Sequence, residues 1–482
     1  MSWARKAWPD LLAAALVAVL VFAFFGHAFL NYDSFYALVW GDDLAHGRVP
    51  QYSVPVAPTP HPLATLAGIV LSPLGDHAET AFLVLVLLAI GALVVGMFRL
   101  GQTLYAAPVG VLAAFIVATR VPLLNYGIRG YVDLPTIALV VWAAVLEART
   151  PRRGAPVLVL LGLAGLLRPE LWGFAAVYWL WCAVPLGGRE RARLAALALA
   201  APVLWCLSDL LITGDPLWSL HGTSDLAAAL GRRTGLGALP STLPRRLGEI
   251  LRLPELIAAV IGCAAGLVYL RRRTLLPLAI AVLNGSAFVV FAIAGLPLLG
   301  RYLFLSGAML ALLAALAALG WTALPATAPE RGRWKIGGLV VLLAILVVFP
   351  VQQVGRLTAL RTDIANRDRV EADLRVLVER PEARRAITAC RPLYVPNHRP
   401  IPQLAYWTGR RPSQVEAIGT APSGAGTYLS PATDAVAKLS VLDPRDPKPL
   451  GTAVPRTGAG PPGYREVARN RSWVLFAGAC RG

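Results

Sequence analysis

Residues 9–30 read PDLLAAALVAVLVFAFFGHAFL, and the polar segment NYDSFY (31–36) follows them directly. A helix that spans a bilayer needs about 20 consecutive apolar residues. This run is long enough, and it lacks the small-residue cleavage pattern of a secretory signal, so we expect it to remain as a membrane anchor. Apolar windows of similar length recur along the chain up to residue 352. The pattern predicts a polytopic membrane protein built mainly of α-helices.

The composition supports this class. Of 482 residues, 56% are hydrophobic and 15% are charged, whereas an ordinary soluble domain has about 25% charged residues. The hydropathy pattern predicts about eleven transmembrane helices. They lie at about residues 9–30, 79–98, 103–119, 131–147, 155–167, 170–186, 194–213, 256–270, 275–295, 301–320 and 336–352.

Lys and Arg gather in alternate loops, which predicts the orientation by the positive-inside rule. The clusters are Arg5 with Lys6; Arg99; Arg149, Arg152 and Arg153; Arg189, Arg191 and Arg193; Arg271, Arg272 and Arg273; and Arg331, Arg333 and Lys335. The amino terminus is then cytoplasmic and the carboxyl terminus is outside. The net charge of +18 follows largely from topology and anionic headgroups, so we expect membrane lipids as partners and no nucleic acid. Richness in Ala, Leu, Arg and Gly indicates a bacterium with a GC-rich genome, and we expect the protein in the bacterial inner (plasma) membrane.

The chain divides into a membrane domain at residues 1–354 and a small extracytoplasmic α/β domain at residues 355–482. In the second domain DIANRDRVEADLRVLVERPEARRA has helical spacing of its apolar residues. The segments PLYVPN, QLAYWTG, SQVEAI and SWVLFAG resemble short strands, and the Gly- and Pro-rich region 420–465 predicts long loops. Cys390 and Cys480 fall in this domain. In an oxidising compartment they predict a disulfide, with two unpaired buried thiols as the alternative.

Two long loops precede this domain, at residues 31–78 and 214–255. In the first, DSFYALVWGDDLAHG has the periodicity of an amphipathic helix, which we expect to lie on the outer membrane surface. Its GDD motif (41–43) resembles an acidic metal motif, but a solvated helix face explains it better. His46, His77 and His221 share no metal-ligand spacing with it. The sequence therefore supports no metal and no other cofactor.

Asp33 stands at the expected start of that helix. It is either the N-cap, for which Asp is among the preferred residues, or a general base at the mouth of an outward cavity, and these roles are compatible. Tyr36 and Trp40 follow on the same helix, and His61 lies in the proline-rich segment APTPHPLATL. We assign Tyr36, Trp40 and His61 to a substrate groove, with a surface role as the alternative for His61.

Further charges lie in apolar surroundings on the expected outer side. Asp133, in GIRGYVDLPTIAL, follows Arg129 by four residues and either reaches the headgroups or faces the same outward cavity as Asp33. Arg168 and Glu170 occur in LLRPELW, and Arg301 with Tyr302 in GRYLF. An isolated arginine in a bilayer costs about 3 kcal/mol on insertion scales. Either Glu170 alone offsets Arg168, or the arginines bind phosphate.

These motifs, in this order and on one expected side, resemble the GT-C glycosyltransferase superfamily. An acid after the first span, GRVP, a Pro-rich approach to a second helix, VDLP, LLRPE and RY carry the resemblance, which extends over about residues 9–320. Among GT-C enzymes the chain resembles the protein O-mannosyltransferases and the lipid A aminoarabinose transferases. The resemblance implies inverting transfer of a sugar, a hexose or pentose, from a polyprenyl-phosphate carrier to an acceptor outside the cytoplasm. That acceptor is a glycan, a lipid or a protein.

The resemblance also implies roles for individual residues. Asp33 and Asp133 become the catalytic acids, and Arg129, Arg168, Arg301 and Tyr302 the binding residues for the donor phosphate. Glu170 joins Tyr36, Trp40 and His61 in the substrate groove. The chain departs from the family pattern at Ser34, because a Glu commonly follows the first acid there.

Two other classes of function remain open. A transporter or flippase for lipid or solute also places charges in a cavity between spans, although such proteins seldom carry a large external tail. A structural protein of the cell envelope would tolerate the substitution Asp33→Asn.

Overall fold

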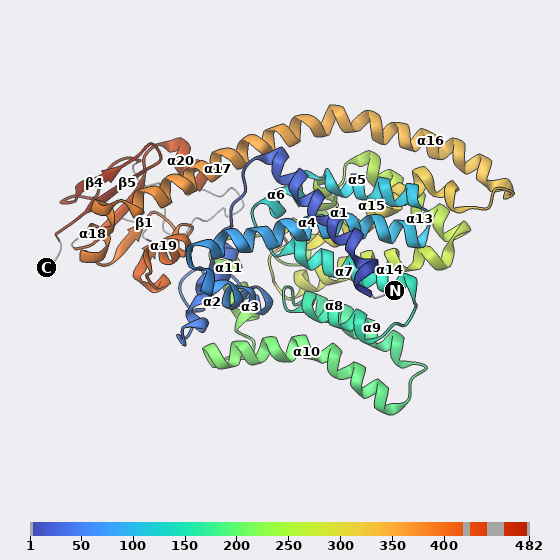
Figure 1. Ribbon diagram of the computed structural model, residues 1–482, viewed down its shortest axis with the longest axis horizontal. Coiled ribbons are helices and arrows are strands. Elements are labelled where there is room, and N and C mark those ends of the chain that lie inside the picture. Colours follow the sequence, from blue (N-terminus) through green and yellow to red (C-terminus); the bar gives the residue numbers. More distant parts are fainter. Residues whose placement is uncertain (1–2, 418–424, 441–456, 480–482) are drawn as a thin grey trace. The chain divides into compact units, whose positions relative to one another are not determined.

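The computed structural model describes residues 3–417, 425–440 and 457–479. They form two compact units (Figure 1). Unit 1 consists of Met1–Gly26, Leu83–Leu207 and Thr234–Arg361, and unit 2 of His27–Phe82, Ser208–Arg233 and Thr362–Gly482. The domain boundary expected after residue 354 stays a prediction.

Every predicted apolar span coincides mainly with one helix, because each apolar run is long enough to form several helical turns. The helices are α1 (Trp3–Phe25), α4 (Ala78–Leu104), α5 (Ala107–Ala118), α7 (Asp133–Arg149), α8 (Ala155–Gly165), α9 (Leu171–Ala183), α10 (Gly188–Thr213), α13 (Leu253–Tyr269), α14 (Arg271–Ile293), α15 (Phe304–Leu319) and α16 (Pro329–Phe349). Short 3-10 or π turns, η2 (Leu236–Ala238), η3 (Gly300–Leu303), η4 (Gly320–Ala323) and η5 (Pro350–Val354), lie between some of them.

The number of membrane crossings follows from helix length and apolarity. Within the described residues, six helices are long and apolar enough to cross a membrane. Two bent pairs raise the number to eight. One is α5 with α6 (Val121–Ile128), bent by 63°, and the other is the segment Leu236–Ile250, which contains η2 and α12 (Leu239–Ile250), with α13, bent by 99°. The protein is therefore an integral membrane protein, mainly helical. The count of about eleven transmembrane helices stays a prediction.

Helix α15 forms the centre of unit 1. Almost all of its residues are buried, and it packs against α5, α13, α14 and α16. Glycine permits the closest of these contacts: a Cβ added at Gly262 of α13 would lie 1.8 Å from the carbonyl oxygen of Leu313 in α15. Small residues at such crossings let helix backbones approach each other inside membranes.

We expect Gly262→Ala to destabilise unit 1, because the new methyl group forces α13 and α15 apart. Overpacking of this kind costs about 1–3 kcal/mol. Thermal unfolding in detergent measures the effect. Gly285→Ala in α14 is the matched control, since a Cβ there meets no atom within 4 Å; equal unfolding temperatures for both variants would contradict the prediction.

Unit 2 combines helices with a five-stranded sheet. Its helices outside the sheet region are α2 (Tyr32–Ala45), α3 (Pro62–Leu71), the turn η1 (Ser72–His77), α11 (Trp218–Ala229), the later part of α17 (Gly355–Glu379) and α18 (Pro381–Ala389). The sheet region contains β1 (Leu393–Val395), α19 (Ile401–Thr408), η6 (Pro412–Gln414), β2 (Val415–Ala417), β3 (Thr427–Pro431), α20 (Asp434–Ser440), β4 (Arg465–Arg469) and β5 (Trp473–Ala477).

The strand order is β2-β1-β3-β5-β4. Strand β1 is parallel to both neighbours, so that Tyr394 lies opposite Glu416 of β2 and Tyr428 of β3. Strand β5 is antiparallel to β3 and to β4. The predicted helix at DIANRDRVEADLRVLVERPEARRA and the strands in PLYVPN, SQVEAI and SWVLFAG are confirmed.

One prediction for this domain is wrong. QLAYWTG is not a strand but most of α19, in which Pro402 lies in the first turn and Gly409 ends the helix in the left-handed conformation. The long loops expected in region 420–465 stay a prediction, because β3 and α20 form only part of the region and residues 441–456 lie outside the described residues. Cys390 is buried at the end of α18, but Cys480 lies outside the described residues, so their pairing stays a prediction.

Helix α2 exists where expected, but it does not present a wide polar face. Residues 34–41 and Asp43 are buried, because α3 and α19 both pack against α2. Contact with α3 is close: a Cβ at Gly41 would lie 2.4 Å from the backbone of Gly68. Asp43 is therefore not part of a solvated helix face.

Candidate active site

The first candidate site lies in unit 1 and contains a buried ion pair between Asp133 and Arg168. Asp133 is the first residue of α7, and Arg168 lies between α8 and α9. Their exposed fractions are 4% and 6%. Asp133 therefore does not reach the headgroups as an isolated acid, and Glu170 is not the sole partner of Arg168. A pair this buried requires good geometry to offset the loss of hydration.

Two tyrosines connect three arginines around this pair. The guanidinium of Arg168 lies 5.1 Å from the ring centroid of Tyr302. Arg301 lies 5.7 Å from the same ring and 5.6 Å from the ring of Tyr131. Arg129 lies 5.4 Å from the ring of Tyr131. The aromatic faces attract the cations, so the predicted residues Arg129, Arg168, Arg301 and Tyr302 form one cluster with Tyr131, which the sequence did not indicate.

The cluster carries more positive than negative charge. Arg168 interacts electrostatically with Asp133, Arg301 and Glu170, and Glu170 is partly buried beside them. The second carboxylate oxygen of Asp133, Oδ2, is buried and accepts no hydrogen bond from the described residues. The cluster and its neighbours thus contain three guanidinium groups and two carboxylates. Such an excess of planar, always charged donors suits an anionic phosphate group.

The second candidate site lies in unit 2, at the start of α2. The N-cap is Asn31, not Asp33: the Asn31 side chain accepts hydrogen bonds from the backbone N–H groups of Asp33 at 2.7 Å and Ser34 at 3.4 Å. Asp33 lies in the first turn and is partly buried. Its carboxylate is therefore not needed as the cap, and the general-base role stays a prediction.

The predicted groove residues occupy different environments. Tyr36 and Trp40 are enclosed in the core of unit 2, with ring centroids 4.8 Å apart. Burial raises the pKa of the Tyr36 phenol well above its ordinary value. This enclosure favours a packing role for both residues. His61 is buried as the N-cap residue of α3, so it is not a surface group, and its place in a groove stays a prediction.

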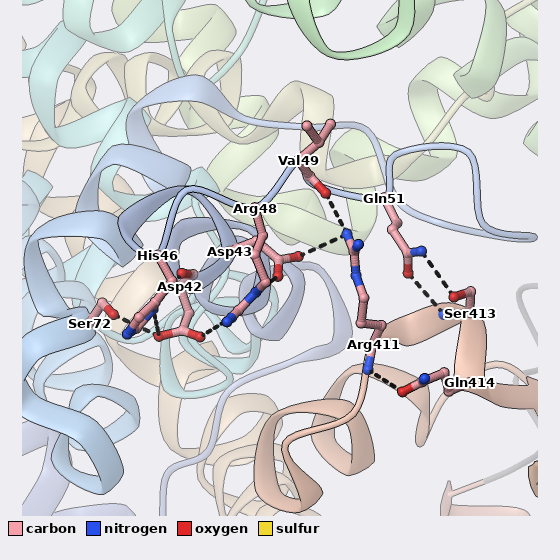
Figure 2. A network of polar contacts seen from close by, with 10 residues as sticks. All are labelled: Asp42, Asp43, His46, Arg48, Val49, Gln51, Ser72, Arg411, Ser413 and Gln414. Carbon is pink, nitrogen blue, oxygen red and sulfur yellow. Dashed lines mark hydrogen bonds and ion pairs between the residues drawn. The ribbon is translucent and has the colours of Figure 1, made fainter. Parts of the chain in front are cut away.

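The GDD motif takes part in an ionic network within unit 2 (Figure 2). Arg48 donates to Asp43 at 2.7 Å and to Asp42 at 2.8 Å, and these carboxylates raise the pKa of Arg48. Ser72 also donates to Asp42, at 2.7 Å. Arg411, from the sheet region, contacts the carbonyl of Val49 and lies 3.8 Å from Asp43.

A second link lies beside it: Gln51 donates to Ser413 at 2.9 Å and accepts from its N–H at 3.1 Å (Figure 2). Among the described residues, no group of three or more His, Cys, Asp or Glu side chains has a metal-binding arrangement. The acids of the GDD motif thus connect the first long loop to the carboxyl-terminal sheet region through arginine.

Unit 1 contains a second buried ion pair, which the sequence did not predict. Arg120 Nη1 lies 2.7 Å from Glu255 Oε1, and both side chains are 2% exposed. Arg120 is the N-cap residue of α6, and Glu255 lies in the first turn of α13. The available signal was the same as for Arg168, a charged residue at the end of an apolar run. The partner, 135 residues away, is not evident from local sequence.

No family model matches this chain and no curated protein matches its sequence. Among solved structures, ArnT from Cupriavidus metallidurans, bound to undecaprenyl phosphate, has a similar fold, with a TM-score of 0.55 at 13% identity. The similarity covers 99% of this chain and 98% of that one. The fold is therefore that of the GT-C glycosyltransferases, as the sequence resemblance implied.

Two structures of the Archaeoglobus fulgidus oligosaccharyltransferase match at a TM-score of 0.47. The first, in complex with Zn and sulfate, is 12% identical, over 83% of this chain and 61% of that one. The second, tethered to an acceptor peptide, is 13% identical, over 87% of this chain and 66% of that one.

Proposed function

We propose that the protein is a membrane glycosyltransferase that moves a sugar from a polyprenyl-phosphate donor to an acceptor outside the cytoplasm, with inversion at the anomeric carbon. The observation that carries the proposal is the cluster of Arg129, Arg168 and Arg301 on Tyr131 and Tyr302. A fold similar to that of ArnT, whose structure contains undecaprenyl phosphate, supports a lipid phosphate as the anion. We also propose that the protein lies in a bacterial inner membrane and that its amino terminus is in the cytoplasm.

The proposed chemistry needs one base and one anion-binding site. Asp33 accepts the proton of an acceptor hydroxyl, whose oxygen attacks the anomeric carbon. The new glycosidic bond forms as the bond from that carbon to the phosphate oxygen breaks, and the lipid phosphate leaves with the electron pair. Arginines stabilise the charge that develops on the phosphate. No general acid is required, because a phosphate is already a good leaving group.

Transfer is tested with purified protein, a panel of radiolabelled polyprenyl-phosphate hexoses and pentoses, and a membrane extract as acceptor. Labelled product formed in detergent, without a gradient, supports the proposal. Uptake of label into vesicles without product would instead identify a transporter or flippase. If the protein shows neither transfer nor uptake, a structural role in the envelope is favoured.

Arg301→Ala is expected to weaken donor binding, because it removes a guanidinium group from the cluster. Loss of one charge-assisted contact costs about 1.5–3 kcal/mol, so the KM for the donor rises by about tenfold or more. Arg301→Lys keeps the charge without the planar fork and recovers part of this loss. Arg189→Ala, at an exposed position of α10, is the control; a KM equal to that of this control would argue against phosphate binding by Arg301.

A further inference from the structure

The loop that follows β1 contains three polar residues between two prolines: Pro396, Asn397, His398, Arg399 and Pro400. It connects β1 to α19. Since β1 has parallel neighbours on both sides, this loop lies at the carboxyl end of a parallel strand. Ligands of open α/β sheets bind outside the carboxyl ends of the strands. The position is thus a typical one for a binding residue, and neither proposed site includes it.

Within unit 2 the loop lies beside the first turn of α2. The ring of His398 packs edge-on against Tyr32, with centroids 5.3 Å apart and an interplanar angle of 81°. Tyr32 is the first residue of α2 and precedes Asp33. Its hydroxyl donates to the carbonyl of Val56 at 2.7 Å, which fixes the ring against which His398 packs.

Arg399 and Asp33 act on the same phenol. Burial raises the pKa of Tyr32, the negative charge of Asp33 adds to this rise, and the positive charge of Arg399 opposes it. The guanidinium and the proposed catalytic carboxylate therefore both lie within electrostatic range of the Tyr32 hydroxyl.

Local structure holds the loop in this position. The backbone N–H of Arg399 donates to the side chain of Asn397 at 3.0 Å, and Asn397 is buried. Helix α19, which begins directly after the loop, packs against α2: the ring of Phe35 lies 5.6 Å from that of Trp407 and 6.3 Å from that of Tyr406. The backbone of the loop is therefore held by the buried Asn397 and by the packing of α19 on α2.

We propose that the Asn397–Arg399 loop completes the site of Asp33, and that Arg399 binds an anionic oxygen group, a phosphate or a carboxylate, of a substrate. The proposal rests on the proposed role of Asp33 in glycosyl transfer. Guanidinium groups match both anions through parallel N–H donors. Either the lipid-phosphate donor or an acceptor that carries an anionic group near its hydroxyl supplies this chemistry.

Two binding measurements on the full-length protein in detergent distinguish these sources. Radiolabelled undecaprenyl phosphate probes the donor, and glucose 6-phosphate, which carries hydroxyls and a phosphate, probes the acceptor by calorimetry. Arg399→Ala is expected to weaken binding of one probe by about tenfold or more, in line with the loss of a charge-assisted hydrogen bond. Arg399→Lys should weaken it less, because it keeps the charge. Arg399→Gln keeps a polar side chain and replaces Arg399→Ala if that variant does not fold.

Arg384→Ala is the matched control, since Arg384 is an exposed arginine of α18 outside the proposed site. A loss of affinity for undecaprenyl phosphate alone assigns Arg399 to the donor, and a loss for glucose 6-phosphate alone assigns it to the acceptor. Equal affinities in the Arg399 and Arg384 variants, or binding of neither probe by the unmodified protein, would overturn the proposal. Because binding is measured without turnover, a protein that transfers no sugar but loses affinity on Arg399→Ala would refute only the proposed function.

Discussion

Asp33→Asn is expected to abolish sugar transfer while the protein remains folded. A general base contributes about 10²–10⁴-fold to a rate, so we expect kcat to fall by about that factor with little change in the KM for the donor. The variant keeps the size and polarity of the side chain. It also keeps the helix cap, because Asn31 rather than Asp33 accepts the first N–H groups of α2. Loss of activity can then be attributed to the carboxylate and not to unfolding of α2.

The measurement is turnover of a radiolabelled polyprenyl-phosphate sugar, with binding of undecaprenyl phosphate and thermal unfolding recorded on the same samples. Asp225→Asn, in α11 of the same unit, is the control, because Asp225 is exposed. Turnover by Asp33→Asn within a factor of two or so of this control would rule out Asp33 as the base.

The sequence predicted helices well where the physical signal is local. Each apolar run became a helix, since about 20 apolar residues can satisfy their backbone only internally in lipid. Strand β3 was missed because its sequence, TYLSP, resembles a turn, although all five of its residues are buried. Helix α19 was predicted as a strand because the segment QLAYWTG begins after Ile401, the first residue of the helix. With that residue, Ile401, Leu404 and Ala405 form a buried helical face.

Charged residues were also predicted well only where the signal is local. An arginine in apolar surroundings is visible in the sequence, which is why Arg168 and Arg301 are predicted as site residues. The identity of the partner depends on how helices pack, and for Arg168 local reasoning offered Glu170, two residues away, where the structure has Asp133. Tyr131 was missed for the same reason: an aromatic ring between two arginines is a property of the assembled bundle.

Removal of either partner of the Arg120–Glu255 pair is expected to cause the largest loss of stability. Both side chains are buried, and Arg120 also donates to the carbonyl of Ile116 at 3.1 Å and to Thr119 at 3.3 Å. The pair therefore joins the end of α5 to the start of α13, at the points where two helix pairs bend by 63° and 99°. Truncation of one partner leaves a buried charge without compensation, which costs about 3–5 kcal/mol.

Thermal unfolding of Arg120→Ala and Glu255→Ala in detergent measures this loss. Arg193→Ala is the control: it removes an exposed ion pair with Glu190, 3.6 Å apart and 68% and 46% exposed, and such pairs contribute about 0–1 kcal/mol. We expect the unfolding temperature to fall sharply for both variants of the buried pair and to change little for the control.

The double variant Arg120→Met/Glu255→Leu separates charge from packing. Apolar side chains of similar volume often replace a buried ion pair with no loss of stability, whereas either charge alone destabilises the protein. The double variant should therefore be more stable than the single variants Arg120→Met and Glu255→Leu, which complete the double-mutant cycle, with a coupling free energy of about 0.5–3 kcal/mol. Additive losses would show that the two charges act independently, and that the bends of α5–α6 and α12–α13 are held by the surrounding apolar contacts instead.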